Sequence, residues 1–213
     1  LGTPNAGVDG WREILGGDGA FVAIDPNNVD IVFASTTQGD INKSTNRGAG
    51  SAGAGFESAT NGLNDTFPFI TPFVMDPSNS QTLWTAGTRL WRTTDQADNW
   101  SAASVVFDLD QVGESTAIAV SPSNSNLVLN GRSFGFILRN DNAGTAGPSS
   151  NWQVVDASQG NISSIVFDPV ASQTVYATVS TLGQDHVLRS TDAGQTWAAI
   201  DRRGQAGGIP NIG

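Results

Sequence analysis

The sequence predicts an all-β fold built from four repeated units of four short antiparallel strands. Two observations carry this prediction. An apolar run that stops at Asp-Pro or Ser-Pro recurs four times, at spacings of 51, 45 and 47 residues, which is a period typical of stacked supersecondary units. No stretch shows the apolar period and the caps of a long helix. The prolines that mark the units are Pro26, Pro77, Pro122 and Pro169.

The first strand of each unit is the β-rich run before the proline, because proline cannot donate to a strand ladder and so marks a strand end. A turn of Asn, Ser, Asp and Gln follows, and then a second apolar run. We therefore predict first strands at 21–25, 72–76, 117–121 and 164–168. The second strands are predicted at 31–34, 83–86, 127–130 and 175–178.

The third apolar run of each unit ends in Arg, Lys and small polar residues, and a turn containing Gly or Asp follows it. A large aromatic residue then opens a fourth strand. The predicted third strands are 41–44, 90–93, 136–139 and 187–190. The fourth strands are predicted to begin at Trp100, Trp152 and Trp197, with Phe56 at this position in the first unit.

The turn after the third strand resembles the Asp-box, or BNR, repeat Ser/Thr-x-Asp-x-Gly-x-Thr-Trp. The full match is residues 190–197, and the other three copies, at 44–48, 93–100 and 140–144, are degenerate but in phase. The resemblance spans nearly the whole chain. It implies a β-propeller of four-stranded antiparallel blades, with about four blades here as part of a larger propeller.

The Asp-box residues are interpreted as structural. An Asp side chain accepts hydrogen bonds from backbone N–H groups of its own turn, Gly supplies positive φ, and Trp seals the gap between the third and fourth strands. Their repetition is explained by the repeat itself. The residues assigned to this structural role are Asp95, Trp100, Asn142, Gly144, Ser190, Asp192, Gly194 and Trp197.

The domain prediction is a single propeller segment over residues 1–213, with no second domain. The two ends of the sequence are interpreted as parts of neighbouring blades in a longer propeller. The alternative is that the four units close into a ring by forming a dimer. The repeats are predicted at about 16–60, 61–105, 106–157 and 158–202, with 1–15 as the outer strand of a preceding blade and 203–213 as the start of a following one.

Composition narrows the function. A chain of 213 residues that is 38% hydrophobic can bury a real core. It has no Cys, which removes disulfides and thiolate chemistry, and its net charge of −10 disfavours nucleic acid or an anionic membrane. No signal peptide or apolar run of transmembrane length is present, so the predicted export to the extracellular space, periplasm or cell surface implies a leader already removed. The expected partners are proteins or carbohydrates.

A binding site is expected on the loops that join the second and third strands and on the links between blades. These loops lie at the end of the blades opposite the Asp-box turns, and propeller ligands commonly use that end. The alternative is that these are ordinary solvated loop charges. The candidate rim residues are Asp40, Arg89, Arg132, Asp185 and His186, the only histidine.

An acidic stretch, 107–114, is predicted between blades at the same end. Asp108, Asp110 and Glu114 could offer oxygen ligands to calcium or paired carboxylates for glycoside hydrolysis. The spacing does not match an EF-hand loop, and a solvated turn is the favoured interpretation. The three residues therefore join the candidate ligand-binding rim, and no metal, cofactor or catalytic residue is predicted.

The propeller families that this sequence resembles differ in function, and each would leave a different motif. A sialidase-like propeller would have a tyrosine nucleophile and an Arg-Ile-Pro motif. No such motif occurs, and Tyr176, the only tyrosine, lies in mid-strand. Xyloglucanase-type blades combine an Asp-Pro turn with an Asp-box, and residues 25–28 resemble that turn. Sortilin-type receptors and photosystem assembly propellers bind proteins or peptides. The hypothesis is a noncatalytic interaction or structural module that binds protein or glycan. The alternative is a glycoside hydrolase fragment acting through an acidic pair.

Overall fold

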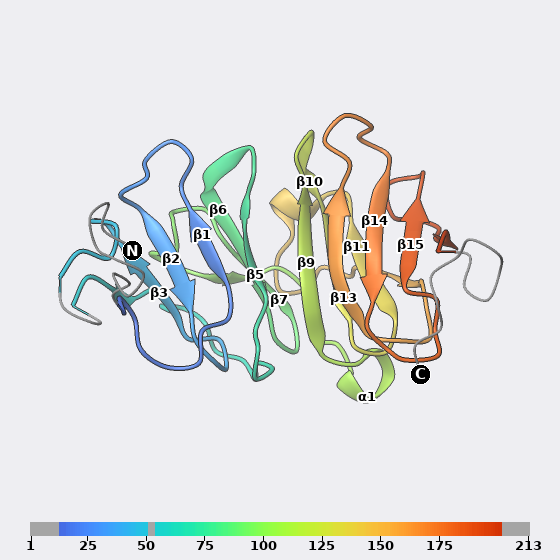
Figure 1. The fold of residues 1–213 in the computed structure, drawn as a ribbon, viewed down its shortest axis with the longest axis horizontal. Helices are drawn as coiled ribbons and strands as arrows, with labels where there is room; N and C mark the ends of the chain where they lie inside the picture. The colour runs from blue at the N-terminus through green and yellow to red at the C-terminus, as the bar shows by residue number, and fades with distance from the viewer. Residues whose placement is uncertain (1–12, 51–53, 202–213) are drawn as a thin grey trace, which may run out of the picture.

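The structure, a computed structural model, describes residues 13–50 and 54–201 as an arc of four four-stranded antiparallel sheets (Figure 1). Each sheet is one blade and uses four consecutive strands. Blade 1 holds β1 (Val22–Ile24), β2 (Val32–Ser35), β3 (Ile41–Ser44) and β4 (Glu57–Ser58). Blade 2 holds β5 (Phe73–Asp76), β6 (Asn79–Ala86), β7 (Leu90–Thr93) and β8 (Ser101–Ala102).

The second half of the chain repeats this arrangement. Blade 3 holds β9 (Ser115–Ser121), β10 (Asn124–Arg132), β11 (Phe136–Asn140) and β12 (Gln153–Asp156). Blade 4 holds β13 (Ile162–Phe167), β14 (Val175–Val179), β15 (Val187–Ser190) and β16 (Ala198–Ala199). The predicted all-β architecture is confirmed, and each fourth strand follows directly after its predicted aromatic residue. The helical elements of the described residues are α1 (Leu109–Val112) and the single 3-10 turn η1 (Ala143–Thr145).

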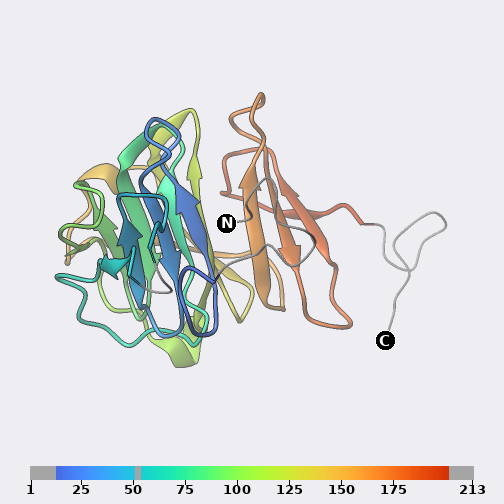
Figure 2. The same ribbon diagram turned by 60° about the vertical axis from the view of Figure 1, so that its left-hand side comes forward.

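The blades pack face to face, with their first strands side by side (Figures 1 and 2). One hydrophobic cluster fills each of the three gaps between neighbouring blades. Phe33 of blade 1 meets Leu83 and Trp100 of blade 2 in the first gap, and all three side chains are buried. Since every core is shared by two blades, a blade is stable only against its neighbours.

The antiparallel order places the connections at two opposite ends of the blades. The first strand of each blade begins at the end that carries α1 and ends at the opposite end. The turns between first and second strands and the Asp-box turns therefore lie at that opposite end. The loops between second and third strands and the links from blade to blade lie with α1, at the lower edge of Figure 1. We call this the loop end.

The proline turns are fixed by the residue before each proline. Asp25 accepts a hydrogen bond from Asn27 N at 2.8 Å, and Asp76 accepts one from Ser78 N at 2.8 Å. A carboxylate that bonds the backbone two residues on mimics a turn, which explains why the first strands stop at Asp-Pro. Gln96 of blade 2 also donates to the second oxygen of Asp25, so this turn is tied to the next blade.

The Asp-box turns of blades 1, 2 and 4 share a backbone contact, and the turn of blade 3 uses a different one. Asp192 accepts hydrogen bonds from Gln195 N at 3.1 Å and Thr196 N at 2.9 Å, as the resemblance predicts. The hydroxyl of Ser190 accepts from Gly194 N at 2.8 Å. The first residue of the box therefore holds the turn as firmly as the Asp. The same hydroxyl contact recurs at Ser44 and Thr93, and Asn140 Oδ1 accepts from Asn142 N.

The tryptophans of the boxes are not equivalent. Trp100 and Trp152 are each 4% exposed, and their indole nitrogens donate to carbonyls of the preceding blade, Ala59 O and Ala103 O. Trp197 is only partly buried and donates to Gly194 O within its own turn. Trp197 belongs to the last described blade, so the strongest Asp-box contacts lie at Trp100 and Trp152 rather than at the best sequence match.

The pKa of Asp192 gives a testable consequence of its turn. Hydrogen bonds from the Thr196 side chain and backbone lower this pKa from 3.8 to about 2. A lowered folded-state pKa means that the carboxylate stabilises the fold above pH 4 and loses this contribution as the pH falls toward 2. Asp192→Asn should therefore destabilise the chain at neutral pH, and its difference from the wild type should shrink between pH 4 and pH 2. Urea unfolding over a pH series measures this, and a pH-independent difference would contradict it.

Candidate functional site

Large apolar side chains are exposed at the loop end. They come from the link between blades 1 and 2 and from the loops between second and third strands of blades 3 and 4. Their exposed fractions are 58% for Phe69, 45% for Ile70, 52% for Phe134 and 68% for Leu182. Exposed apolar groups that gather on one surface, with polar groups around them, are typical of interaction sites. The sequence analysis selected charged residues and missed these four.

Backbone contacts hold these apolar residues in place. The Phe69 carbonyl accepts from Gln38 N at 2.9 Å, which ties the link between blades 1 and 2 to a loop of blade 1. Ser133 N donates to Glu114 O at 2.9 Å, and Glu114 N donates to the Ser133 hydroxyl at 2.9 Å. These contacts fix Phe134 beside Glu114, so the apolar groups sit on ordered loops.

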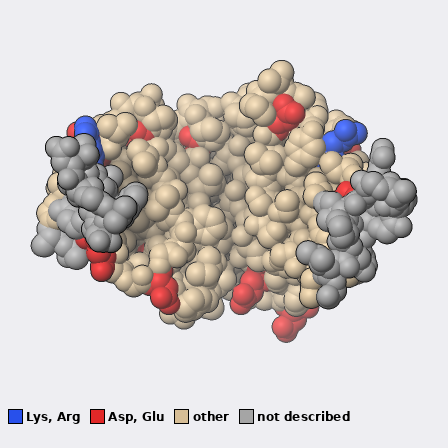
Figure 3. Space-filling view, viewed as in Figure 1, with Lys and Arg blue, Asp and Glu red and all other residues tan. Residues whose placement is uncertain are grey.

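Exposed carboxylates lie at the same end of the blades as the exposed apolar residues. Asp40, Asp110, Glu114 and Asp185 are all exposed and belong to loops or to α1 at this end. Along the lower edge of Figure 3, where α1 lies, Asp and Glu side chains are visible and no Lys or Arg is. Four of the predicted rim residues thus share one acidic and partly apolar surface, which favours a partner with positive and apolar groups.

An open groove of about 350 Å³ lies at the loop end between blades 1 and 2. Asp40, from the β2–β3 loop, and Asp65, from the link between blades 1 and 2, both line it. Asp65 accepts from the Thr88 hydroxyl, from Arg89 N at 3.2 Å and from Trp91 Nε1 at 2.8 Å. Asp65 was missed because a single Asp in an Asn-Asp loop looks like solvent decoration. Its three contacts show that it fixes the link between blades 1 and 2 against a loop of blade 2.

The position of Arg132 differs from the rim prediction. β10 runs to Arg132, so this residue ends a strand rather than lying in a loop, and its side chain is 0% exposed. The guanidinium lies 5.9 Å from the centre of the Phe107 ring and donates to Asn130 Oδ1 at 3.2 Å. Burial lowers the pKa of Arg132 to about 10, and the charges of Glu114 and Asp65 partly offset this. A ligand at the surface cannot reach it.

Of the remaining predicted rim residues, one is packed into the fold and two are at least partly exposed at the surface. His186 is partly buried. Its Nδ1 lies 3.0 Å from Val179 O, and its backbone N donates to Asp201 at 2.6 Å, so it is part of the packing at the start of β15. Arg89 is partly exposed beside Asp65. Asp185 is exposed on the loop before His186.

The acidic stretch forms a helix start instead of the predicted solvated turn. Asp108 is the N-cap of α1, where one carboxylate oxygen accepts from Asp110 N at 3.0 Å and the other accepts from Gln111 Nε2 at 2.8 Å. A capping carboxylate stabilises the free N–H groups of a first turn. All three carboxylates are exposed, and Asp108 is the one that is engaged as a helix cap. Within the described ranges, no three His, Cys, Asp or Glu residues gather as a metal-binding group.

Comparisons with known proteins identify the fold alone. No protein-family model matches the chain, and no curated protein matches it. An ancestral GH74 enzyme superposes with a TM-score of 0.65 at 22% identity, over 87% of this chain and 24% of that one. YCF48 from Cyanidioschyzon merolae gives 0.52 at 17% identity, over 85% and 55%, and YCF48 bound to D1 peptide gives 0.55 at 16% identity, over 85% and 52%.

These likenesses show a β-propeller fold shared with GH74 enzymes and with YCF48. The chain spans only 24% to 55% of the solved chains reported above, so it has the form of part of a propeller. None of the short helices in the described part of the chain is long and apolar enough to cross a membrane. Of the predicted outer strand at 1–15, the described residues 13–15 are not in a strand; residues 1–12 and the predicted blade start at 203–213 lie outside the described residues.

Proposed function

We propose that this chain is a noncatalytic interaction module of an exported or cell-surface protein, which binds a polypeptide partner through its loop end. The observation that carries the proposal is the mixture of ordered, exposed apolar side chains with carboxylates on one surface. Phe69, Phe134 and Leu182 offer apolar contact, and Asp110 and Glu114 supply negative charge nearby. A segment with basic and apolar residues matches this surface in both respects.

The charge of the surface predicts how binding responds to salt. Exposed charges are screened over about 8 Å at physiological ionic strength, so the electrostatic share of the affinity should fall as salt is added. The apolar share should remain. A glycan would also find aromatic groups here, but its uncharged hydroxyls would not explain the carboxylates, and its binding would not depend on salt.

A fluorescence polarisation assay with labelled synthetic peptides tests the proposal. A peptide of alternating Lys and Leu should bind, a Glu and Leu peptide should not, and xyloglucan oligosaccharides should not compete. The double change Phe134→Ser with Leu182→Ser should weaken binding by about tenfold or more, since apolar anchors dominate such interfaces. Val170→Ser is the matched control, because Val170 is 93% exposed in the β13–β14 turn at the opposite end. Equal affinity for the double variant and the wild type would contradict the proposal.

The second candidate is a fragment of a glycoside hydrolase, and the structural likeness to GH74 enzymes favours it. Such a reaction needs two carboxylates about 5 to 10 Å apart across a groove. Asp110 and Glu114 are the exposed carboxylates of the acidic stretch that remain available, since Asp108, also exposed, is engaged as a helix cap. Hydrolysis of a β-glucan by the wild type, with its loss in Asp110→Asn, would establish this candidate in place of the interaction module.

A further inference from the structure

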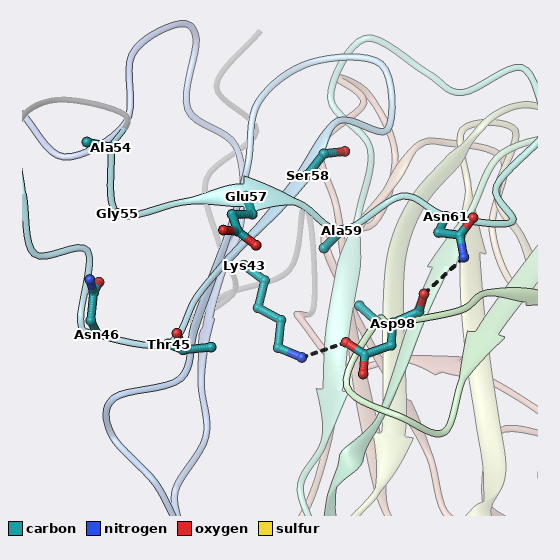
Figure 4. A pocket seen from close by; sticks show the side chains of 11 residues that line it. Lys43, Thr45, Asn46, Ala54, Gly55, Glu57, Ser58, Ala59, Asn61 and Asp98 are labelled. Atoms are coloured by element: carbon teal, nitrogen blue, oxygen red, sulfur yellow. Dashed lines mark hydrogen bonds and ion pairs between the residues drawn. The ribbon is translucent and has the colours of Figure 1, made fainter.

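A polar cavity of about 500 Å³ lies where blades 1 and 2 meet (Figure 4). The third and fourth strands of blade 1 form one side of it, and the Asp-box turn of blade 2 forms the other. Its charged residues are Lys43 of β3, Glu57 of β4 and Asp98 of the turn, and Ala59 and Ala97 form part of its wall. We call this cavity the joint pocket.

The cation on the third strand explains why the pocket is open at this joint. Arg92 of blade 2 and Arg139 of blade 3 each donate to a backbone carbonyl in the turn of the next blade, Ala143 O and Ala193 O. Lys43 holds the same place on blade 1, opposite a buried residue of the second strand, but donates to the Asp98 side chain at 2.9 Å. An ammonium is more compact than a planar guanidinium, so the lysine leaves space that an arginine would occupy.

The fourth strand of blade 1 also differs from those of the next two blades. The residue opposite Lys43 on β4 is Glu57, whereas Arg92 faces Ser101 and Arg139 faces Gln153. Glu57 is exposed, and its carboxylate makes no hydrogen bond or ion pair with any other described residue. Figure 4 shows this carboxylate beside the Lys43 side chain. A carboxylate that remains available therefore lies in the pocket.

The other polar groups of the pocket also have hydrogen-bonding capacity to spare. An ammonium has three N–H donors, and Lys43 uses one of them for Asp98 Oδ1. The Thr45 hydroxyl and Asp98 Oδ2 have no hydrogen-bond partner within the described ranges. The pocket thus offers donors at Lys43 and Thr45 and acceptors at Glu57 and Asp98. A ligand with several hydroxyl groups matches this mixture, because a hydroxyl both donates and accepts.

The charges of the pocket select among hydroxylated ligands. Lys43 is paired with Asp98, so Glu57 is left as a carboxylate without a cation. A neutral sugar would leave this charge unpaired, and a simple amine would leave the Lys43 and Thr45 donors unused. A ligand that combines one positive charge with hydroxyl groups uses both parts of the pocket.

We infer that the joint pocket binds a sugar unit that carries a primary amine. Its ammonium group lies at Glu57, and its hydroxyl groups bond Thr45 and the free N–H groups of Lys43. The pocket is formed by the outer strands of blade 1 and an Asp-box turn, away from the loop end. The inference therefore goes beyond the proposed polypeptide binding and does not depend on it.

An NMR titration of the ¹⁵N-labelled chain tests the inference with two matched probes. The β-1,4-linked trisaccharide of glucosamine should shift the backbone amide signals of Lys43, Glu57 and Asp98 and leave those of Phe134 and Leu182 unchanged. The N-acetylated trisaccharide has no positive charge and should bind about tenfold more weakly or less, because it loses a hydrogen bond between charged groups. Free glucosamine, titrated in parallel, shows whether a single unit or a chain is preferred. The Lys-Leu peptide should shift the loop-end signals instead, so the two binding proposals fail separately.

Two variants test the residues that define the pocket. Glu57→Gln keeps the shape of the side chain and should weaken binding of the glucosamine trisaccharide by about tenfold, to the level of the N-acetylated probe. Asp156→Asn, which removes an exposed carboxylate from the fourth strand of blade 3, is the matched control and should bind as the wild type does. Lys43→Arg keeps the charge but places a guanidinium in the pocket, as at the other two joints, and should also weaken binding by about tenfold without lowering the melting temperature.

Three results would contradict the inference. The first is the absence of shifts at Lys43, Glu57 and Asp98 with the glucosamine trisaccharide at about 10 mM, where even a weak specific site is occupied. The second is equal affinity for the two trisaccharides, which would mean that the positive charge is not recognised. The third is unchanged affinity in Glu57→Gln or in Lys43→Arg.

Discussion

Trp152→Ala is expected to lower the free energy of unfolding by about 3–5 kcal/mol, the usual cost of truncating a buried tryptophan. Trp152 is 4% exposed and lies edge-on to Trp84, with ring centroids 6.0 Å apart. Its indole nitrogen donates to Ala103 O at 2.9 Å, so the truncation also leaves a buried carbonyl without its donor. A single change in the outer turn of blade 3 thus opens the core between blades 2 and 3.

Urea unfolding measures this effect, and Phe134→Ala provides its control. Phe134 is also aromatic but is 52% exposed at the loop end, so its truncation should change stability by no more than about 0.5 kcal/mol. Similar losses for the two variants would mean that the division between fold residues and surface residues is wrong.

Arg139→Ala should cost about 1.5–3 kcal/mol, the range for a hydrogen bond that involves a charged group. Arg139 is 9% exposed, and its Nε donates to Ala193 O at 3.0 Å across the joint between blades 3 and 4. The loss should appear as separate unfolding of blade 4 before the rest, because this contact joins that blade to its neighbour. Hydrogen–deuterium exchange of the blade 4 strands in increasing urea, with far-UV circular dichroism for the whole chain, reports both events.

Arg47→Ala is the control for the buried arginine. Arg47 forms an ion pair with Asp30, but the two side chains are 60% and 47% exposed, so this pair should contribute at most about 1 kcal/mol. A larger loss for Arg47→Ala than for Arg139→Ala would contradict the importance given to cations at the joints between blades.

The sequence predicted the strands well because local chemistry fixes their ends. Asp25 and Asp76 close the proline turns with their own side chains, and Ser190 with Asp192 closes the Asp-box turn. These contacts span two to four residues, so a repeated local pattern is enough to place them. The order of four strands per sheet then follows from the repeat.

The features that sequence reasoning missed depend on contacts between distant segments. Arg132 is buried beside Phe107, which lies 25 positions before it, and Asp65 is fixed by bonds to residues 23 to 26 positions away. The four-residue helix α1 is too short for a periodic pattern and shows only its cap, Asp108. Trp197 belongs to the Asp-box that matches the motif in full, but it is less buried than Trp100 and Trp152, because it lies on the last described blade.

Hydrogen–deuterium exchange with and without the bound Lys-Leu peptide tests most directly whether the loop end is the binding surface. On binding, exchange should slow in the segments around Phe69, Phe134 and Leu182, with little change in the Asp-box turns at 93–100 and 190–197 at the opposite end. Protection of the Asp-box turns, with the three loop segments unchanged, would contradict it.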